Sequence, residues 1–187
     1  FPTTVEYIDF LAGDAHKWLL GPCGAGLMYV RRELQEKLNP PIYGWHNVNN
    51  PNFVAQEQLV LRNDSRKYEA GTHNLAGLVG LLAALKLILE VGVENIGQEL
   101  LRKRAMLVPA LQAKGYSVLG AEASQETGSG IVSFFRPGED FTALNQKLTD
   151  ANIITSLRVD RTGQNYIRLS PHFYITDGEL NRLLELV

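Results

Sequence analysis

The sequence has one cysteine and no long uninterrupted apolar run. These two absences argue against a disulfide-bonded protein and against a membrane-spanning one. A single cysteine, Cys23, excludes an internal disulfide and fits a reducing compartment, so we expect a cytoplasmic protein. The nearest approach to a membrane span, Leu75 to Val91, contains Lys86 and Glu90, so we expect no membrane association. The first residues, Phe-Pro-Thr-Thr, lack an initiator methionine and a signal-peptide pattern, and we expect the chain to be the middle of something larger.

Neither sign of charge dominates the chain. Its 187 residues include 18 basic and 20 acidic side chains, giving a net charge of −2, and 45% of them are hydrophobic. This balance is typical of an ordinary globular protein and provides no electrostatic reason to expect nucleic acid or a membrane surface as a partner. The length suits one large domain or two small ones.

The first third of the chain predicts two short apolar segments followed by a long loop. Ile8 to Ala12 is a short apolar run, and Gly24 to Val30 has the pattern of a buried strand. Gly21-Pro22 between them is a turn signal. Pro40 to Phe53 is rich in Pro, Asn and Gly and includes Trp45, which predicts a long loop that is either functional or disordered.

Two consecutive helices are predicted next. The first begins near Asn74 and ends at Gly92, and because its apolar residues occupy nearly every face we expect it to be buried. Its main apolar positions are Leu75, Leu78, Val79, Leu82, Leu85 and Leu89. Asn95 and Gln98 have the spacing of a capping box for the second helix, which closes at Gly115. Pro109 lies inside it and is expected to kink or restart it.

From residue 116 onward strands and helices alternate. Strands are predicted over Tyr116–Leu119, Gly130–Phe135, Ile153–Val159 and Tyr166–Ser170, and a helix over Phe141–Ala151. Thr176 and Glu179 form a capping box for a last helix. The pattern predicts a small α+β layer of antiparallel strands with helices on one side.

Lys17 is the residue whose position most suggests chemistry. A buried ammonium is costly, and a desolvated lysine shifts toward the neutral amine, which attacks an aldehyde to form a Schiff base. His16 would supply a flat ring beside it, and Gly21 and Gly24 would allow close approach of the backbone. On spacing alone, an exposed lysine at a strand end is the simpler interpretation.

The segment from Asp9 to Gly26 (DFLAGDAHKWLLGPCGAG) resembles the cofactor-lysine segment of class V aminotransferases, which are fold-type I pyridoxal-phosphate (PLP) enzymes. The family pattern is a small or polar residue, any residue, His-Lys, and then Gly-Pro-x-Gly-x-Gly. The resemblance implies that Lys17 forms a Schiff base with PLP and moves protons, with His16 also at the cofactor. Many members bind the cofactor phosphate with a serine or threonine three residues before the lysine. Asp14 stands there instead and would repel phosphate, so that role is not carried over.

A second segment, Tyr68 to Thr72 (YEAGT), resembles the family's Glu-x-Gly-Thr element. The resemblance implies that Thr72, together with Gly71, binds the cofactor phosphate of the partner subunit. The helix expected to open here would favour a phosphate through its backbone amides and its dipole. Thr72 or Asn74 could instead simply cap that helix, and both interpretations hold at once.

A third segment, Ile167 to Tyr174 (IRLSPHFY), resembles the family strand whose arginine grips the substrate α-carboxylate. The resemblance gives that role to Arg168, whose planar guanidinium suits bidentate binding. In a strand Arg168 would point opposite to Ile167 and Leu169, into a cleft or into solvent. From the residues alone a solvent-facing arginine explains it as well. We interpret His172 as a structural, hydrogen-bonded histidine.

The resemblance covers essentially the whole chain but only about the second half of the family's length. It implies an α/β fold: a remnant of the PLP-binding large domain and its mixed sheet over residues 1–72, interdomain helices including a long buried one over 73–115, and a small C-terminal α+β domain over 116–187. It also implies an amino acid substrate and a homodimer with a shared active site. The residues that stack on the cofactor ring and pair with its pyridine nitrogen are absent, so we do not expect the chain alone to be a competent catalyst.

The reaction stays open among transamination, C–S lysis, desulfuration, epimerisation and hydrolysis. A desulfurase of the cysteine-loop type is disfavoured because residues 158–166 hold no cysteine, and Cys23 is expected to be a small core thiol. We expect PLP chemistry at Cα or Cβ of an amino acid, most like that of a class V aminotransferase. One alternative is an inactive fragment serving as an interaction domain, which would have no use for a reactive Lys17. Nucleotide binding through Gly24 and Gly26 is weak because they precede a strand rather than a helix.

Overall fold

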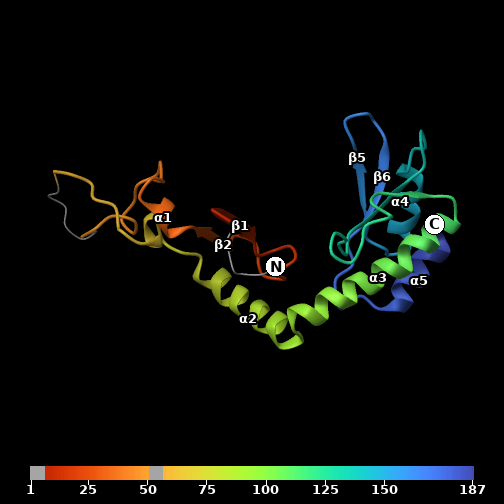
Figure 1. Ribbon diagram of the computed structural model, residues 1–187, viewed down its shortest axis with the longest axis horizontal. Helices are drawn as coiled ribbons and strands as arrows, with labels where there is room; N and C mark the ends of the chain where they lie inside the picture. The colour runs from red at the N-terminus through yellow and green to blue at the C-terminus, as the bar shows by residue number, and fades with distance from the viewer. Residues whose placement is uncertain (1–6, 51–56) are drawn as a thin grey trace. The chain divides into compact units, whose positions relative to one another are not determined.

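The computed structural model describes residues 7–50 and 57–187 and divides the chain into two compact units that meet in sequence between Glu90 and Val91 (Figure 1). The first unit contains β1 (Phe10–Asp14), β2 (Gly26–Val30), α1 (Arg32–Gln35), the 3-10 turn η1 (Ser65–Tyr68) and α2 (Leu75–Val91). The second contains α3 (Val93–Ala113), β3 (Ser117–Val118), β4 (Val132–Phe135), α4 (Thr142–Asp150), β5 (Ser156–Val159), β6 (Asn165–Leu169) and α5 (Asp177–Leu186). The finer division at residues 72 and 115 stays a prediction.

The first unit contains a two-stranded antiparallel sheet, with β1 and β2 in register from Phe10 opposite Val30 to Asp14 opposite Gly26. The expectation of a buried strand over Gly24–Val30 is wrong. Only Val30 of β2 is buried, while Leu27 and Met28 are 48% and 58% exposed. Two strands without further neighbours among the described residues leave apolar side chains uncovered on both faces.

The predicted loop after α1 has no helix or strand over its described residues, 40–50, and its last residues, 51–53, lie outside the described part. Its centre is ordered by Asn47, whose side chain is fully buried. The amide Oδ1 accepts from Gly44 N at 2.9 Å, and Nδ2 donates to the carbonyls of Ile42 and Lys67 at 2.9 and 3.1 Å. Because one buried amide satisfies three backbone groups, it fixes this loop against η1.

Helix α2 exposes much of the surface that the sequence predicts to be buried. Its buried residues are Gly77, Leu81, Ala84 and Ile88, whereas Leu75, Leu78, Val79, Leu82 and Leu89 are between 42% and 70% exposed. The prediction of an all-round buried helix is therefore wrong for this chain. Too few described residues of the first unit pack against α2 to cover more than one of its faces.

Helix α3 begins differently from its prediction. Gly92, with φ +91°, is its N-cap, and no side chain caps the helix. The expected capping box of Asn95 and Gln98 is wrong, since Asn95 Nδ2 donates backward to Val91 O at 2.8 Å. No single helix among the described residues is long and apolar enough to cross a membrane, and α2 and α3 meet that test only jointly, as a pair broken between them.

The rest of α3 runs through Pro109 to Ala113 as one helix, so of the two expected effects of the proline the restart is wrong, and the kink stays a prediction. Proline removes one backbone donor, and the burial of Leu107 and Leu111 on either side, both fully inaccessible, outweighs that loss. The predicted close at Gly115 is confirmed, with φ +83° and its N–H donating to Gln112 O at 2.9 Å.

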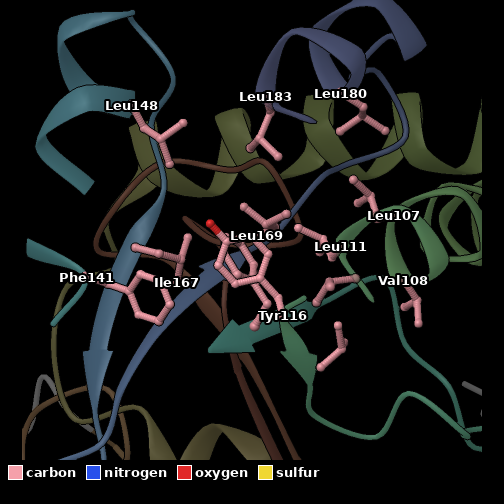
Figure 2. Packing of buried hydrophobic residues seen from close by; sticks show 13 residues of the cluster. Leu107, Val108, Leu111, Tyr116, Phe141, Leu148, Ile167, Leu169, Leu180 and Leu183 are labelled. Atoms are coloured by element: carbon pink, nitrogen blue, oxygen red, sulfur yellow. The ribbon is translucent and has the colours of Figure 1, made fainter. Parts of the chain in front are cut away.

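The second unit is built on a sheet in the order β3-β4-β6-β5, and its strands are antiparallel, as predicted. β3, β4 and β5 are shorter than expected, whereas β6 has the expected length and lies one residue earlier. Val132 and Phe134 of β4 lie opposite Leu169 and Ile167 of β6, so all four share one face. That face packs on α3, α4 and α5 (Figure 2). The buried cluster comprises Leu107, Val108, Leu111, Tyr116, Val118, Val132, Phe134, Phe141, Leu148, Ile167, Leu169, Leu180 and Leu183. The predicted capping box of α5, Thr176 with Glu179, is confirmed.

Candidate active site

Lys17 lies in the connection between β1 and β2, three residues after the end of β1. Its side chain is 68% exposed, and Nζ forms an ion pair with Asp14 Oδ2 at 2.6 Å. The hydrogen bond and positive charge of Lys17, with a smaller effect from His16, lower the pKa of the Asp14 carboxyl below its usual range. The lysine is thus an accessible amine with a carboxylate counter-ion, which confirms the exposed strand-end lysine that the spacing alone favoured and not a desolvated one.

The connection that carries Lys17 is held against α2 by small residues. Ala15 is fully buried, and its N–H donates to Ala25 O at 3.0 Å, which extends the pairing of the two strands. A Cβ at Gly21 would lie 2.9 Å from Ala15 Cβ and 3.3 Å from Leu81 Cδ1. The close backbone approach predicted from the glycines is therefore present, and it fixes the base of the turn while leaving Lys17 outside.

Cys23 lies in the same connection and is exposed. The expectation of a small core thiol is wrong, because the apolar contacts of this turn to α2 are made by its neighbours. Pro22 packs against Gly80, because a Cβ added to Gly80 would lie 2.9 Å from the ring of Pro22.

Gly71 and Thr72 are exposed and lie ahead of α2, which begins only at Leu75. The expectation that they open the helix is wrong, because Asn74 does so: its Oδ1 accepts from Gly77 N at 3.0 Å. The Asn74 Nδ2 donates to Gly24 O at 3.2 Å. This second bond ties the segment bearing Thr72 to the connection bearing Lys17.

An aromatic cluster that the sequence analysis missed lies beside Thr72. The rings of Trp45 and His46 are 4.1 Å apart, those of His46 and His73 are 5.2 Å apart, and His73 Nδ1 contacts Glu69 Oε2 at 2.6 Å. The available signal was the spacing of Glu69 and His73, four residues apart around Gly71-Thr72. A separate open cavity of about 770 Å³ is lined in part by Asp14, Tyr68 and Glu69, and Lys17 does not line it.

Arg168 belongs to the second unit, on β6. It lies opposite Ser133 of β4 and Ser156 of β5, on the face of the sheet away from the core, as the alternation with Ile167 and Leu169 predicts. The side chain is half-buried, and its Nε is buried without a hydrogen-bond partner among the described residues. A buried, unsatisfied guanidinium N–H is unfavourable, and a carboxylate is the group that satisfies it best.

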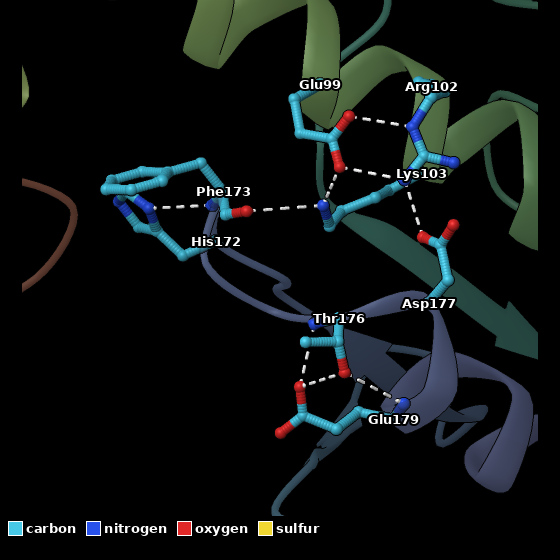
Figure 3. Close-up of polar contacts among 8 residues, drawn as sticks. All are labelled: Glu99, Arg102, Lys103, His172, Phe173, Thr176, Asp177 and Glu179. Atoms are coloured by element: carbon cyan, nitrogen blue, oxygen red, sulfur yellow. Dashed lines mark hydrogen bonds and ion pairs between the residues drawn. The ribbon is translucent and has the colours of Figure 1, made fainter. Parts of the chain in front are cut away.

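The connection between β6 and α5 is fixed to α3 by a polar network that the sequence analysis did not predict (Figure 3). Lys103, whose side chain is 2% exposed, pairs with Glu99 and donates to Phe173 O at 3.3 Å. Arg102 joins Glu99 at 2.7 Å to Asp177 at 2.5 Å. The hydrogen bonds from Arg102 and then Lys103 lower the pKa of Glu99 to about 2. The only signal in the sequence was the four-residue spacing of Glu99 and Lys103.

His172 is buried within this connection, and its Nδ1 accepts from Phe173 N at 2.9 Å. Its ring stacks on that of Tyr174, with centroids 5.2 Å apart and planes 12° apart. The interpretation as a structural, hydrogen-bonded histidine is confirmed.

The family model described as Aminotransferase class-V matches residues 6–183. The chain belongs to this family. An uncharacterized aminotransferase of Bacillus subtilis is 28% identical over 178 residues, which cover 95% of this chain and 44% of that protein. The chain thus spans less than half the length of the curated relatives it matches.

Solved structures agree with this assignment. The apo cysteine desulfurase of Thermococcus onnurineus superposes with a TM-score of 0.84 at 25% identity, covering 95% of this chain and 46% of that one. A mutant of the cystine C–S lyase C-DES, with glycine covalently linked to its PLP cofactor, gives 0.79 at 27% identity, covering 96% and 45%. The predicted fold class, a part of the PLP-dependent transferase fold, is confirmed.

Proposed function

We propose that this chain is the lysine-bearing portion of a PLP-dependent enzyme that acts on an amino acid, with a reaction closest to that of a class V aminotransferase. The observation that carries the proposal is the placement of Lys17. Its amine is accessible at the end of β1, on a connection whose base is fixed to α2 by Gly21, Leu81 and the Asn74–Gly24 hydrogen bond. The family match over residues 6–183 supports the same role.

The residues present fit PLP at two of its contacts and the substrate at one. Lys17 offers an exposed amine for the cofactor's aldehyde carbon, and Gly71 and Thr72 are exposed for the phosphate of the partner subunit's cofactor. Arg168 Nε is an orphaned buried donor that suits the substrate carboxylate. When bound, the cofactor supplies an electron sink that stabilises negative charge at the substrate Cα.

The chain's own residues then have distinct tasks. Lys17 would hold the cofactor through Nζ, and the same atom would accept and return a proton. Arg168 orients the substrate by its carboxylate, and the Lys103–Glu99 pair keeps the segment after Arg168 in place. His16 lies next to Lys17 and belongs to the cofactor side of the site. A homodimer in which Thr72 serves the partner's cofactor, in a reducing cytoplasmic setting, completes the proposal.

Cleavage of a C–S bond is the second candidate, and the C-DES and desulfurase structures support it. The β5–β6 turn supports one type of C–S cleavage over the other. Asp160 accepts from Thr162 Oγ1 at 2.6 Å and from Tyr166 OH at 2.8 Å, and no cysteine is present in the turn to receive sulfur. A lyase that needs no protein thiol is therefore favoured over a desulfurase that does. Release of a persulfide and ammonia from cystine, compared with transfer of the amino group to an added 2-oxo acid, separates the two reactions.

Trapping of PLP tests the proposal directly. The purified chain is incubated with PLP, reduced with borohydride and mapped by peptide mass spectrometry. We expect stoichiometric modification at Lys17, none at Lys67 or Lys86, and loss of the modification in Lys17→Arg. Modification spread evenly over these lysines, or unchanged in the variant, would refute the assignment of Lys17.

A further inference from the structure

Asp14 is the nearest charged neighbour of Lys17 and has no place in the roles above. It is the last residue of β1, and its Oδ2 lies 2.6 Å from Lys17 Nζ. Both side chains are more than half exposed. In the class V pattern that this segment resembles, a serine or threonine that binds phosphate often stands here, so Asp14 places a negative charge where an anion would otherwise be received.

The backbone holds the two residues of this pair in place. Asp14 is paired with Gly26 in the strand register, and Ala15, which follows it, is fully buried. On the other side, Lys17 O accepts from Leu20 N at 3.2 Å and Ala15 O accepts from Gly21 N at 2.8 Å. Less backbone freedom is therefore lost when this pair forms than when a surface ion pair joins two mobile segments.

We propose that Asp14 is a positioning residue that acts as the counter-ion of Lys17, keeping Nζ paired and turned toward β1 until a cofactor displaces it. The carboxylate also excludes phosphate from this side, which leaves Gly71 and Thr72 of the partner subunit as the proposed phosphate contacts. His16 is the other titratable group that acts on Asp14, and the residues of α2 and its N-cap that pack on this connection, Asn74, Gly80 and Leu81, are uncharged. The inference rests on the proposed function only in taking Lys17 as the attachment residue.

The effect is measurable because only a neutral amine reacts with an aldehyde. The ammonium first gives its proton to solvent, the nitrogen lone pair attacks the carbonyl carbon, and the carbonyl oxygen leaves as water. Cyanoborohydride then delivers hydride to the C=N bond, and with formaldehyde the product is a methylated lysine. Formaldehyde carries no charge, so its rate at Lys17 reports the state of the amine without any contribution from phosphate.

The experiment compares initial rates of reductive methylation at Lys17, resolved by peptide mass spectrometry at one fixed neutral pH. In Asp14→Asn we expect the rate at Lys17 to rise about two- to fivefold, as for loss of an exposed ion pair, with no change at Lys37 or Lys86. Asp14→Glu should restore most of the original rate. Asp9→Asn is the matched control, since it removes the same charge one residue before β1 but breaks a pair with Arg31 instead. An unchanged Lys17 rate in Asp14→Asn, or an equal rise in Asp9→Asn, would overturn the proposal.

A second pair of probes tests the exclusion of phosphate. Borohydride trapping at Lys17 is repeated with PLP and with pyridoxal, which lacks the phosphate, in the wild type and in Asp14→Asn. The variant should gain more with PLP than with pyridoxal, and equal gains would refute the exclusion. A wild-type chain that reacts with formaldehyde under control of Asp14, but never selectively with PLP, would retain this inference while refuting the proposed function.

Discussion

The two compact units of this chain differ in how completely they bury their apolar side chains. In the second unit, residues from three helices and one sheet face close into a core in which Leu107, Leu111 and Phe134 are fully inaccessible. Its exposed large apolar residues, such as Ile154 at 85%, are fewer than those of the first unit. In the first unit they line one face of α2, where Leu75, Val79 and Leu89 are each more than 65% exposed.

This contrast shows that burial of an apolar face has two requirements, which a sequence pattern does not distinguish. Periodicity states which face of an element is apolar, but burial requires partner residues to cover that face. The second unit contains those partners, whereas the described part of the first unit contains fewer than α2 and the β1–β2 sheet require. Contiguous exposed apolar surface of this kind marks a contact face in soluble proteins. It agrees with a chain that spans less than half the length of its relatives.

The largest expected effect on the free energy of unfolding comes from a buried leucine of the second unit, which we compare with an exposed leucine of the first. Leu111→Ala removes a side chain with no exposed surface, and we expect a loss of about 2–5 kcal/mol in the free energy of unfolding. Leu82→Ala, at a helix position that is 54% exposed, should change it by less than about 0.5 kcal/mol. Urea unfolding followed by far-UV circular dichroism measures both. Tryptophan fluorescence reports the first unit alone, because Trp18 and Trp45 both lie there. Equal losses would mean that α2 is covered in solution.

The second prediction concerns acid stability, which depends on Glu99 in the second unit. The pKa of Glu99 is about 2 in the folded chain, against an ordinary value near 4.5, because Arg102 and Lys103 hydrogen-bond its carboxylate. Between those values the unfolded state binds the extra proton, so falling pH favours unfolding. The stabilisation from Glu99 is complete above about pH 4.5 and is lost progressively toward pH 2. The difference in unfolding free energy between wild type and Glu99→Gln should shrink over this window. A constant difference would argue against the ion-pair network.

Local signals in the sequence predicted most of the second unit. The strand alternation around Ile167 and Leu169 and the capping box of Thr176 and Glu179 act over a few residues, and the structure reproduces them. The buried ion pair of Lys103 was not predictable in the same way. Its burial depends on Phe173 O, seventy residues away in the chain, and helical spacing alone is typical of a solvent-exposed pair.

In the candidate site, the motif around Lys17 predicted the family, which the family model confirms, but not the environment of the lysine. Exposure of Lys17 and Cys23 depends on which segments cover the β1–β2 connection, and no pattern within residues 9–26 encodes that. The capping box proposed for Asn95 failed for a related reason. Gly92 already turns the chain with a positive φ, so α3 starts two residues before Asn95, whose side chain serves the end of α2 instead.

Apart from the Leu82→Ala comparison, the smallest expected effects come from the helix caps, one in each unit. Asn74→Ala and Thr176→Ala each remove a side chain that accepts a backbone N–H in the first turn, and each should cost about 1 kcal/mol. Only Asn74 has a second task, because its Nδ2 also donates to Gly24 O in the Lys17 connection. Asn74→Asp retains the acceptor of the cap and removes this donor, so it separates the two contributions.

We therefore expect Asn74→Asp to unfold like the wild type by circular dichroism while the amide hydrogens of residues 15–25 exchange faster with solvent. Thr176→Ala should lose stability in the second unit and leave exchange over residues 15–25 unchanged. If Asn74→Asp leaves that exchange unaltered, the Lys17 connection is held by Gly21 and Pro22 against α2 without help from the cap. The cap and Lys17 would then be independent features of the first unit.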